Sequence, residues 1–314
     1  MQMIGVDLGG TNIKAALVTD TGVILQEESR PTNLPRPAQA VCDDIAAMCG
    51  RLAAQADGPV RGIGVGCPGT VDAASGTVLY SNNLAWERFA MGPYLAQKTG
   101  LPVFLANDAN AAALGEARAG CAKDAQSAVI LTLGTGVGGG VVLGGKLLTG
   151  YTGAASEPGH MSVNGAPDAP LCTCGRRGCL ETYASATALI RQTKAAMAAH
   201  PESAMHALAQ DGGVSGRTAF DAAQQGDAAA AAVVDEYIHW LAMGVANLIA
   251  IFYPQVVGLS GGVANQGENL LVPLRAAVEP LVFGHAFAIK KTQIIGCTLG
   301  YRAGVIGAAM LVEG

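Results

Sequence analysis

Two stretches of this 314-residue chain share one design, in which an apolar β-like run enters a glycine-rich turn and leaves it in a second β-like run. The first, MIGVDLGGTNIKAALV, starts at residue 3, and the second, AVILTLGTGVGGGVVLGGKLL, starts at residue 128. Helical patterns follow each stretch: residues 38–54 alternate apolar and polar side chains at helical spacing, and TAFD near residue 218 has the form of a helix start before the long run beyond Asp227. This repeated order predicts an α/β protein of two domains, each with its own core.

A polar segment of small residues, EARAGCAKDAQS at 116–127, separates the two halves and is a suitable domain boundary. We predict a smaller N-terminal α/β domain over 1–118, completed by a C-terminal segment at about 301–314, and a larger α/β domain over 119–300. Such halves suggest an actin-like phosphotransferase with nucleotide in the cleft between them. Because many α/β proteins alternate strands and helices in this way, the duplication alone does not decide the architecture.

Composition excludes several classes of protein. Half of the residues are hydrophobic, 14% are charged, and the formal net charge is −5 with no basic run, so neither duplex nucleic acid nor a membrane surface is expected as a main partner. The N-terminus has no basic segment or cleavage site typical of a signal peptide. The longest apolar stretch, 238–253, is shorter than the roughly 18 residues of a membrane span and precedes Pro254, which predicts a buried core helix. We therefore expect a cytoplasmic protein.

Three glycine-rich turns are candidates for nucleotide binding. In DLGGTN at 7–12, glycines let backbone N–H groups surround an anion, and Asp7 could hold a water on Mg²⁺; a plain hairpin turn is the alternative. LGTGVGGG at 133–140 contains G-x-G-x-x-G, but a strand rather than a helix follows, which favours a second phosphate-binding hairpin over a dinucleotide site. VVGLSGGVAN at 256–265 ends a strand where a base and ribose could pass close to the backbone. The candidate residues are Asp7, Gly9, Gly10, Thr11, Asn12, Lys14, Thr135, Gly136, Gly261 and Gly262.

Four metal-ligating residues are clustered with the spacing H-x11-C-x-C-x4-C: His160, Cys172, Cys174 and Cys179. One nitrogen and three sulfurs form a full tetrahedral set for Zn²⁺, and four protein ligands leave no open position, so the predicted zinc is structural. A disulfide is the alternative, but it would leave one cysteine and the histidine without a role, and the cytosol keeps thiols reduced. The other five cysteines are expected to be isolated, small buried hydrophobes: Cys42, Cys49, Cys67, Cys121 and Cys297.

In their order along the chain, DLGGTN, LGTGVGGG, E-x-GH with CTCGRRGCLE, and LSGGV resemble the ROK family of sugar kinases over nearly the whole sequence. The resemblance implies a two-domain actin-like ATPase fold of the sugar kinase, hexokinase and Hsp70 type, with nucleotide and sugar in the interdomain cleft. In that family the zinc-bound loop borders the hexose site. By resemblance, Glu157 and Glu181 accept hydrogen bonds from sugar hydroxyls, and His160 binds zinc through one ring nitrogen and the sugar through the other.

The segment VFLANDANAAALGEA, at 103–117, reads as a buried strand followed by an alanine-rich helix. By resemblance, Asp108 is the general base that takes the proton of the attacked hydroxyl, and Asn107 binds a neighbouring hydroxyl. An ordinary helix N-cap is the alternative role of Asp108. GCPGTVD and SNNLAW resemble loops that close over the sugar through Gly69 and Asn83, and N-L-x-W is closest to the glucokinase branch.

The sequence departs from the family pattern at Ser156, where glycine is common, at Pro158, where an aliphatic residue is usual, and at Asn82. The resemblance still implies ATP-dependent phosphorylation of a hexose 6-hydroxyl, with Mg²⁺ accompanying ATP and glucose as the first candidate. Kinases for N-acetylmannosamine, fructose, mannose or allose are the alternatives.

Two non-enzymatic classes are more remote. A sugar-sensing regulator would need a DNA-binding segment before the first predicted strand, and an actin-like filament protein would have no use for a zinc-ordered sugar site. We expect a homodimer or homotetramer; the preferred hexose, and whether polyphosphate replaces ATP, stay open.

Overall fold

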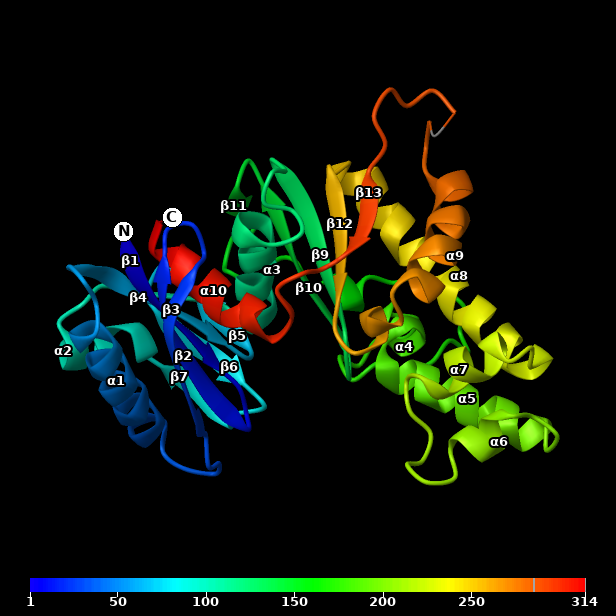
Figure 1. Cartoon of the computed structure of the whole chain (residues 1–314), viewed down its shortest axis with the longest axis horizontal. Coiled ribbons are helices and arrows are strands. Elements are labelled where there is room, and N and C mark those ends of the chain that lie inside the picture. Colours follow the sequence, from blue (N-terminus) through cyan, green and yellow to red (C-terminus); the bar gives the residue numbers. More distant parts are fainter. Residues whose placement is uncertain (285, 314) are drawn as a thin grey trace. The chain divides into compact units, whose positions relative to one another are not determined.

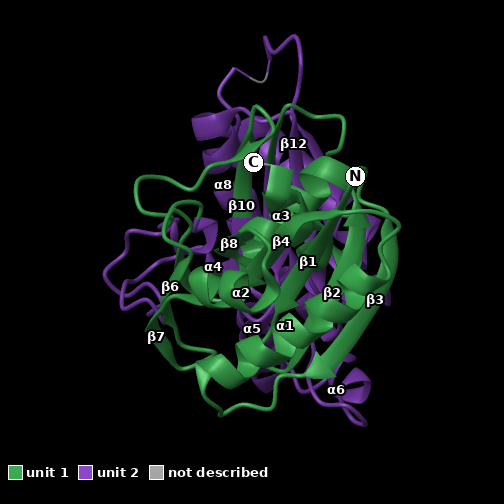
Figure 2. Ribbon diagram, turned by 90° about the vertical axis from the view of Figure 1, so that its left-hand side faces the viewer, with its two compact units in different colours: residues 1–128, 140–156, 297–314 green, residues 129–139, 157–296 purple. Residues whose placement is uncertain are grey.

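The computed structural model describes residues 1–284 and 286–313 (Figure 1). Its contacts divide the chain into two compact units, coloured in Figure 2: unit 1 comprises Met1–Ala128, Gly140–Ser156 and Cys297–Gly314, and unit 2 comprises Val129–Gly139 and Glu157–Gly296. The ranges 1–118 and 119–300 remain predictions of domain organisation. The units differ from them by grouping 119–128 and 140–156 with the N-terminal part.

Unit 1 is built on a five-stranded sheet in the order β3-β2-β1-β4-β8. Short turns join its three antiparallel strands, β1 (Gln2–Leu8), β2 (Asn12–Thr19) and β3 (Ile24–Pro31). Strands β4 (Val60–Cys67) and β8 (Val103–Asn107) run parallel to β1, so they are reached through the crossover helices α1 (Ala38–Ala54) and α2 (Met91–Thr99). A smaller antiparallel sheet contains β5 (Thr70–Asp72), β6 (Thr77–Ser81) and β7 (Trp86–Phe89). Helix α1 has the predicted bounds.

Helices cover both faces of the main sheet of unit 1, which explains why β1 and β4 are apolar almost without alternation. The residues of α1 and α2 share one core cluster with Ile4, Val6 and Ile63. On the other face, α10 (Ala303–Met310) packs with α3 (Asp108–Ala119) in a second cluster around Met3. The C-terminal segment therefore completes the fold of unit 1.

Glycines bring α10 into direct backbone contact with its neighbours. A Cβ at Gly5 on β1 would lie 1.9 Å from the Val305 carbonyl oxygen, and one at Gly64 on β4 would lie 1.7 Å from that of Ala308. A Cβ at Gly307 on α10 would lie 1.7 Å from the carbonyl oxygen of Ala111 on α3. Because backbone atoms cannot move aside, only glycine fits these positions.

The second sheet has the order β11-β10-β9-β12-β13. Its strands are β9 (Ser127–Leu133), β10 (Val137–Leu143), β11 (Lys146–Leu147), β12 (Val256–Ser260) and β13 (Gln293–Gly296). The α-helices of unit 2 are α4 (Glu181–Ala184), α5 (Ala186–Ala199), α6 (Met205–Leu208), α7 (Thr218–Gln224), α8 (Ala228–Phe252) and α9 (Glu268–Val278). Short 3₁₀ turns include η1 (Pro158–His160), η2 (Val263–Gln266) and η3 (Glu279–Leu281) in unit 2, and η4 (Gly300–Arg302) and η5 (Leu311–Glu313) in unit 1.

The predicted core helix is α8, whose buried side chains include Tyr237, Leu241 and Val245 and which ends at Phe252, just before Pro254. The predicted helix start at Thr218 is also found, but that helix is the short α7, and α8 begins separately with the Asp227 side chain accepting a hydrogen bond from the Ala230 N–H at 2.9 Å. Across the described residues, no helix has the length and hydropathy to cross a bilayer.

Substitution of Gly307 tests the close packing of α10 on α3. Gly307→Ala is expected to lower the free energy of unfolding by about 2 kcal/mol or more, because the added methyl meets backbone atoms of Ala111. Gly50→Ala on α1 is the control: Gly50 is exposed and its Cβ would meet nothing within 4 Å, so alanine should stabilise by up to about 1 kcal/mol. Urea denaturation measures both, and a Gly307→Ala protein as stable as the unchanged chain would contradict this packing.

Candidate active site

The turn between β1 and β2 carries the first set of predicted residues. The N–H of Gly9 donates to the carbonyl oxygen of Asn12 at 2.9 Å and closes the turn. Gly10, Thr11 and Asn12 are exposed, so their N–H groups and the Thr11 hydroxyl can face an anion.

Sequence reasoning missed Thr32, the residue that supports this turn. Thr32 is fully buried; its N–H donates to the Thr11 carbonyl at 2.8 Å and its hydroxyl to the Gly9 carbonyl at 2.7 Å. No motif marks Thr32, because it follows β3 and reaches the turn only through the antiparallel pairing of β2 with β3.

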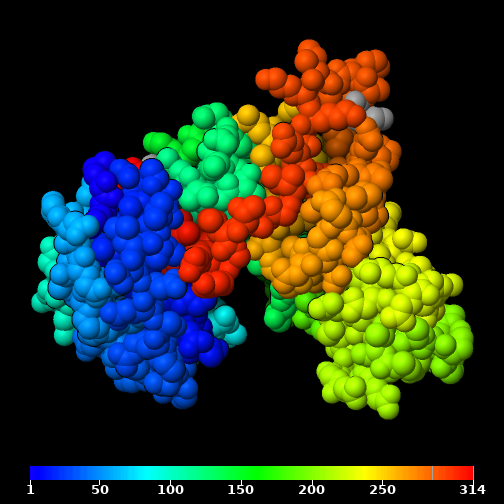
Figure 3. All heavy atoms as spheres, in the orientation of Figure 1, coloured from blue at the N-terminus to red at the C-terminus, as the bar shows by residue number. Residues whose placement is uncertain are grey.

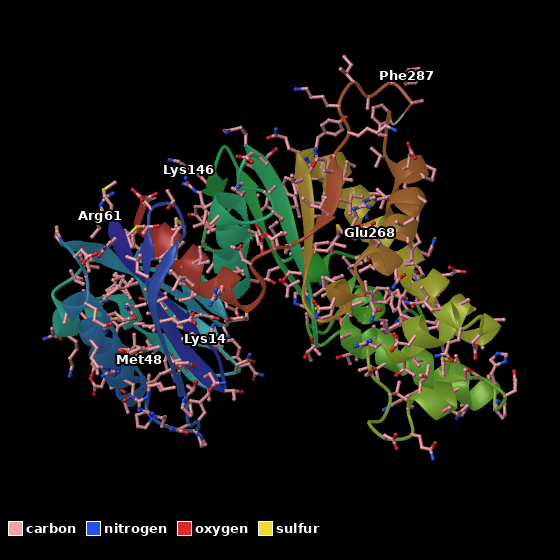
Figure 4. The ribbon with its side chains drawn as sticks, in the orientation of Figure 1. Lys14, Met48, Arg61, Lys146, Glu268 and Phe287 are labelled. Carbon is pink, nitrogen blue, oxygen red and sulfur yellow. The ribbon has the colours of Figure 1, made fainter. Side chains whose placement is uncertain are left out.

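Two carboxylates in unit 1, Asp7 and Asp108, have perturbed acidity. Asp7 is opposite Lys14 in the β1–β2 pairing, and Lys14 is labelled in Figure 4. Burial raises the pKa of Asp7, the charge of Lys14 lowers it, and the charge of Asp108 raises it further. A Cβ at Gly304, in the first turn of α10, would lie 2.9 Å from the carboxyl carbon of Asp7, so that position leaves space for the carboxylate.

Asn107, and not Asp108, is the N-cap of α3. The Asn107 amide oxygen accepts from the N–H groups of Ala109 at 2.9 Å and Asn110 at 3.2 Å. Its amide nitrogen donates to the Gly69 carbonyl at 3.1 Å. Asp108 is the half-buried first residue of the helix, and burial raises its pKa more than its hydrogen bonds lower it. Its carboxylate is thus a stronger base than an exposed one.

The predicted sugar loops lie near the same strand ends. Gly69 has φ of +105°, and a Cβ there would lie 2.2 Å from the Tyr80 carbonyl oxygen, so the loop requires glycine. Asn83 is exposed between the buried side chains of Leu84 and Ser81, and its carbonyl oxygen is 3.9 Å from the position of a Cβ at Gly10.

The pairing registers of β1, β4 and β8 explain why these predicted site residues lie close together, because the registers align Asp7 with Gly66 and Cys67 with Asn107. Parallel strands present their carboxyl ends at one edge of a sheet, which is where open α/β sheets bind ligands.

Unit 2 contains the second glycine turn, between β9 and β10. The Gly134 N–H donates to the Gly136 carbonyl at 3.0 Å, and the Thr187 hydroxyl at the start of α5 donates to the Thr135 carbonyl at 2.7 Å. Gly261 follows β12 with φ of +90°, and its Cβ would lie 2.5 Å from the Leu133 carbonyl oxygen. The two predicted nucleotide-binding turns of unit 2 are therefore adjacent, while Gly262 is exposed beside them.

The cysteine cluster has the geometry of a four-ligand metal site. One ligand atom from each of His160, Cys172, Cys174 and Cys179 lies within 4.8 Å of the others. The His160 Nδ1 is 3.5 Å from the Cys172 sulfur, and the Cys174 and Cys179 sulfurs are 3.6 Å apart. A tetrahedral zinc with ligands at about 2.3 Å for sulfur and 2.0–2.1 Å for nitrogen places them roughly 3.6 Å (N to S) and 3.8 Å (S to S) apart. The donor set therefore fits Zn²⁺.

Arg176, which the sequence did not single out, shapes this loop. Its guanidinium donates to the His160 carbonyl at 2.7 Å, and its carbonyl accepts from the Cys172 N–H at 2.7 Å. A backbone hydrogen bond from Arg176, followed by its side chain, lowers the pKa of the exposed Cys174 thiol to about 6. A thiolate is the form that a metal binds.

Glu181 connects the cysteine loop to the glycine turn. One carboxylate oxygen accepts from the Val137 N–H at 3.0 Å, and the other accepts from the Thr173 hydroxyl at 3.3 Å. A Cβ at Gly136 would lie 2.2 Å from this carboxylate, and a Cβ at Gly159 would lie 1.9 Å from the Val137 carbonyl oxygen. Glu157 is exposed immediately before η1. The loop and the turn therefore form one packed structure within unit 2.

Ser156 shows why glycine suits its position. Its φ is +66°, a left-handed conformation that glycine adopts without a steric penalty. The Ser156 hydroxyl donates to the Leu148 carbonyl at 2.8 Å, which helps serine to hold this conformation. Pro158 packs where Gly139 has no side chain, since a Cβ there would lie 2.7 Å from its ring.

The fold and the glycine turns define a two-domain α/β protein of the actin-like kinase class. A family model described as ROK family matches residues 3–314. The Thermotoga maritima glucokinase is 38% identical over 100% of this chain and 98% of the relative. The Shigella boydii N-acetylmannosamine kinase is 35% identical over 100% and 99%. A ROK family glucokinase from Streptomyces griseus, solved in complex with glucose and AMPPNP, has a TM-score of 0.79 and 37% identity over 100% and 99%. The chain belongs to the ROK family, and the predicted family and fold class are confirmed.

Removal of the Thr32 hydroxyl tests its support of the β1–β2 turn. Thr32→Val keeps the volume but leaves the half-buried Gly9 carbonyl without this donor, which should cost about 1–3 kcal/mol of stability. Amide hydrogen exchange in residues 9–12 should become faster. Thr21→Val, at an exposed turn, is the control and should leave exchange in that segment unchanged. Equal exchange in both variants would show that Thr32 does not support the turn.

Proposed function

We propose that this protein is an ATP-dependent hexose kinase that phosphorylates glucose at its 6-hydroxyl. The observation that carries the proposal is Asp108, a half-buried carboxylate with a raised pKa that is not the cap of its helix. It lies at the carboxyl end of β8, within the same unit as Asp7 and the β1–β2 turn. The family relatives named as glucokinases, one of them solved with glucose and AMPPNP, support the same activity.

In this proposal Asp108 accepts the proton of the 6-hydroxyl as its oxygen attacks the γ-phosphorus of ATP, and ADP leaves with the electrons of the broken P–O bond. The ionised carboxylate is required, so activity is lost as the pH falls through the raised pKa of Asp108. N–H groups of the glycine turns would bind phosphate oxygens, and Asp7 would hold the nucleotide's Mg²⁺, which would supply charge neutralisation. Asn107, Gly69 and Asn83 bind and orient the sugar.

The cysteine cluster is assigned a structural Zn²⁺. The Nδ1 atom of His160 lies 3.5 Å from the Cys172 sulfur, so Nδ1 would be the zinc ligand and Nε2 would bind a sugar hydroxyl. Glu157 and Glu181 accept hydrogen bonds from other hydroxyls. Because Glu181 also accepts from the Val137 N–H, an ordered zinc loop supports the phosphate-binding turn as well as the sugar.

N-acetylmannosamine is the second candidate substrate, because a kinase for that sugar is 35% identical to the chain over its full length. Measuring the ATP-dependent turnover of a panel of hexoses by the purified protein decides between the two substrates. If the protein phosphorylates none of the hexoses, the result would favour a sugar-sensing regulator.

Substrate preference is the first test. We expect kcat/KM for glucose to exceed that for N-acetylmannosamine and fructose at least about tenfold, roughly 1.4 kcal/mol of differential transition-state binding. The reason is the SNNLAW loop, in which buried Leu84 and Trp86 fix exposed Asn83. Coupled measurement of ADP release gives these values. Equal or faster turnover of N-acetylmannosamine would contradict the assignment of glucose as the substrate but would leave the assignment of kinase activity in place.

Asp108→Asn tests the general base. The variant should keep its thermal midpoint within a few degrees, because Asn107 caps α3, and should still bind glucose. Its kcat should fall at least about a hundredfold, since general-base catalysis contributes about 10²–10⁴. Asp43→Asn, an exposed carboxylate on α1, is the matched control and should keep full activity. More than a tenth of the original kcat in Asp108→Asn would place the base elsewhere.

Cys174→Ser tests the zinc loop. Protein purified without added metal should contain about one zinc per chain by elemental analysis, and the variant should contain much less. Calorimetry should show glucose binding weakened more than ATP binding, because His160, Glu157 and Glu181, which contact the sugar in this proposal, belong to the loop or directly flank it. Cys121→Ser, outside the cluster, should keep its zinc. Zinc-free purified protein, or unchanged glucose affinity in Cys174→Ser, contradicts the assignment.

A further inference from the structure

Two cysteines outside the metal cluster, Cys121 and Cys297, are in contact within unit 1, with their sulfur atoms 3.8 Å apart. Cys121 lies in the loop after α3, Cys297 follows β13, and both are half-buried. The prediction that they are isolated buried hydrophobes is wrong, because segments far apart in the sequence meet here. Cys42, Cys49 and Cys67 are buried, as predicted.

A buried carboxylate fixes both cysteine-bearing segments. One Glu116 oxygen accepts from the N–H groups of Cys121 at 2.9 Å and Thr298 at 3.2 Å, and the other accepts from the Leu299 N–H at 2.8 Å. Glu116 is 1% exposed, and Gly120 leaves it room, since a Cβ there would lie 2.0 Å from the carboxylate. These contacts bind the backbone next to each cysteine, so the sulfur pair is held in place from both sides.

The same contacts argue against a metal at this position. Glu116, Cys121 and Cys297 do bring an oxygen and two sulfurs within 4.8 Å. Glu116, however, already accepts three backbone hydrogen bonds, which use three of the roughly four acceptor sites of a carboxylate. Two thiols in contact then remain as the reactive groups.

We propose that Cys121 and Cys297 are an oxidation site, at which a hydroperoxide joins them in a disulfide that locks unit 1. The Cys121 thiol gives up its proton, and its sulfur attacks an oxygen of hydrogen peroxide. The O–O bond breaks and the released hydroxide takes up that proton, so a sulfenic acid and water form. The Cys297 sulfur then attacks the sulfenic sulfur, the S–O bond breaks, and a second water leaves with the thiol proton. The two thiols lose two electrons in total, and one hydrogen peroxide is reduced to two waters.

Geometry and acidity fit this order of steps. The sulfurs must approach from 3.8 Å to about 2.05 Å, a shift within reach of side-chain rotation in two loops. Contact with Cys121 and burial raise the pKa of Cys297, so Cys297 is the slower thiol toward peroxide and acts second. Figure 3 shows the orange-red segment that enters η4 at the surface beside the green surface of α3. Both cysteines are half-buried and not enclosed, so an oxidant has access.

The bond would join the end of one helix to the start of another. Cys121 follows α3, Cys297 precedes α10, and these helices already pack through Gly115 and Gly307. Linking residues so distant in the chain removes freedom from the unfolded state, which stabilises the folded protein. The inference does not depend on the kinase activity.

The test treats the whole 314-residue chain, as purified, with hydrogen peroxide, blocks remaining thiols by alkylation and maps the peptides by mass spectrometry. A Cys121–Cys297 linked peptide is expected, and dithiothreitol should reverse it. The thermal midpoint should rise by about 5 °C or more on oxidation. Cys121→Ala and Cys297→Ala should lose both effects, and Cys49→Ala should keep the linked peptide.

Three outcomes would overturn the proposal. The first is oxidation of Cys121 to sulfinic or sulfonic acid with no linked peptide. The second is a linked peptide that forms equally fast in urea-unfolded protein, which would show that the fold does not prepare the pair. The third is a linked peptide with no rise in the thermal midpoint. Hexose kinase activity is measured separately, so its absence leaves this result unaffected.

Discussion

The backbone contact of α10 with β1, β4 and α3 is the constraint on which unit 1 depends. At Gly5, Gly64 and Gly307 there is no room for a single methyl group, so these elements meet at one distance and in one register. In the first turn of α10, Gly304 leaves space for the Asp7 carboxylate. Gly307 on the same helix packs against the backbone of α3, the helix that begins with Asp108. A C-terminal helix of eight residues therefore fixes both carboxylates of the candidate site.

In unit 2, the cysteine loop is held by polar contacts and not by a closely packed helix such as α10 in unit 1. The cysteine loop is largely exposed from Thr173 to Arg177, so apolar burial alone cannot order it. The four side chains that fit a metal ion would supply the missing constraints together with the Glu181 bond to the Val137 N–H. The glycine at 136 is then explained by protein packing, because a side chain there would displace the Glu181 carboxylate.

Local patterns in the sequence predicted α1, the start of α7, the buried α8, the glycine turns and the cysteine cluster, because each depends on residues close together in the chain. Contacts between distant segments could not be predicted. Asn107 and Asp108 are equally good caps, and only the fold decides between them. Thr32 and Glu116 show the same limit. Each side chain forms hydrogen bonds with the backbone of a segment distant in the sequence, and no motif links the two segments.

The structure also separates two reasons for glycine that a sequence cannot distinguish. At Gly261 a Cβ would lie 2.5 Å from the Leu133 carbonyl oxygen, so packing within unit 2 already requires glycine. At Gly136 a Cβ would lie 2.2 Å from the Glu181 carboxylate, which would have to move and lose its bond to the Val137 N–H. At Gly262 a Cβ would meet no described atom within 4 Å, and at Gly10 the nearest is 3.9 Å away. Packing does not explain these two exposed glycines, whereas a nucleotide close to the backbone would. At Gly10 and Gly262, as at Gly134, packing leaves the backbone open, which is what the proposed phosphate and ribose binding at these turns requires.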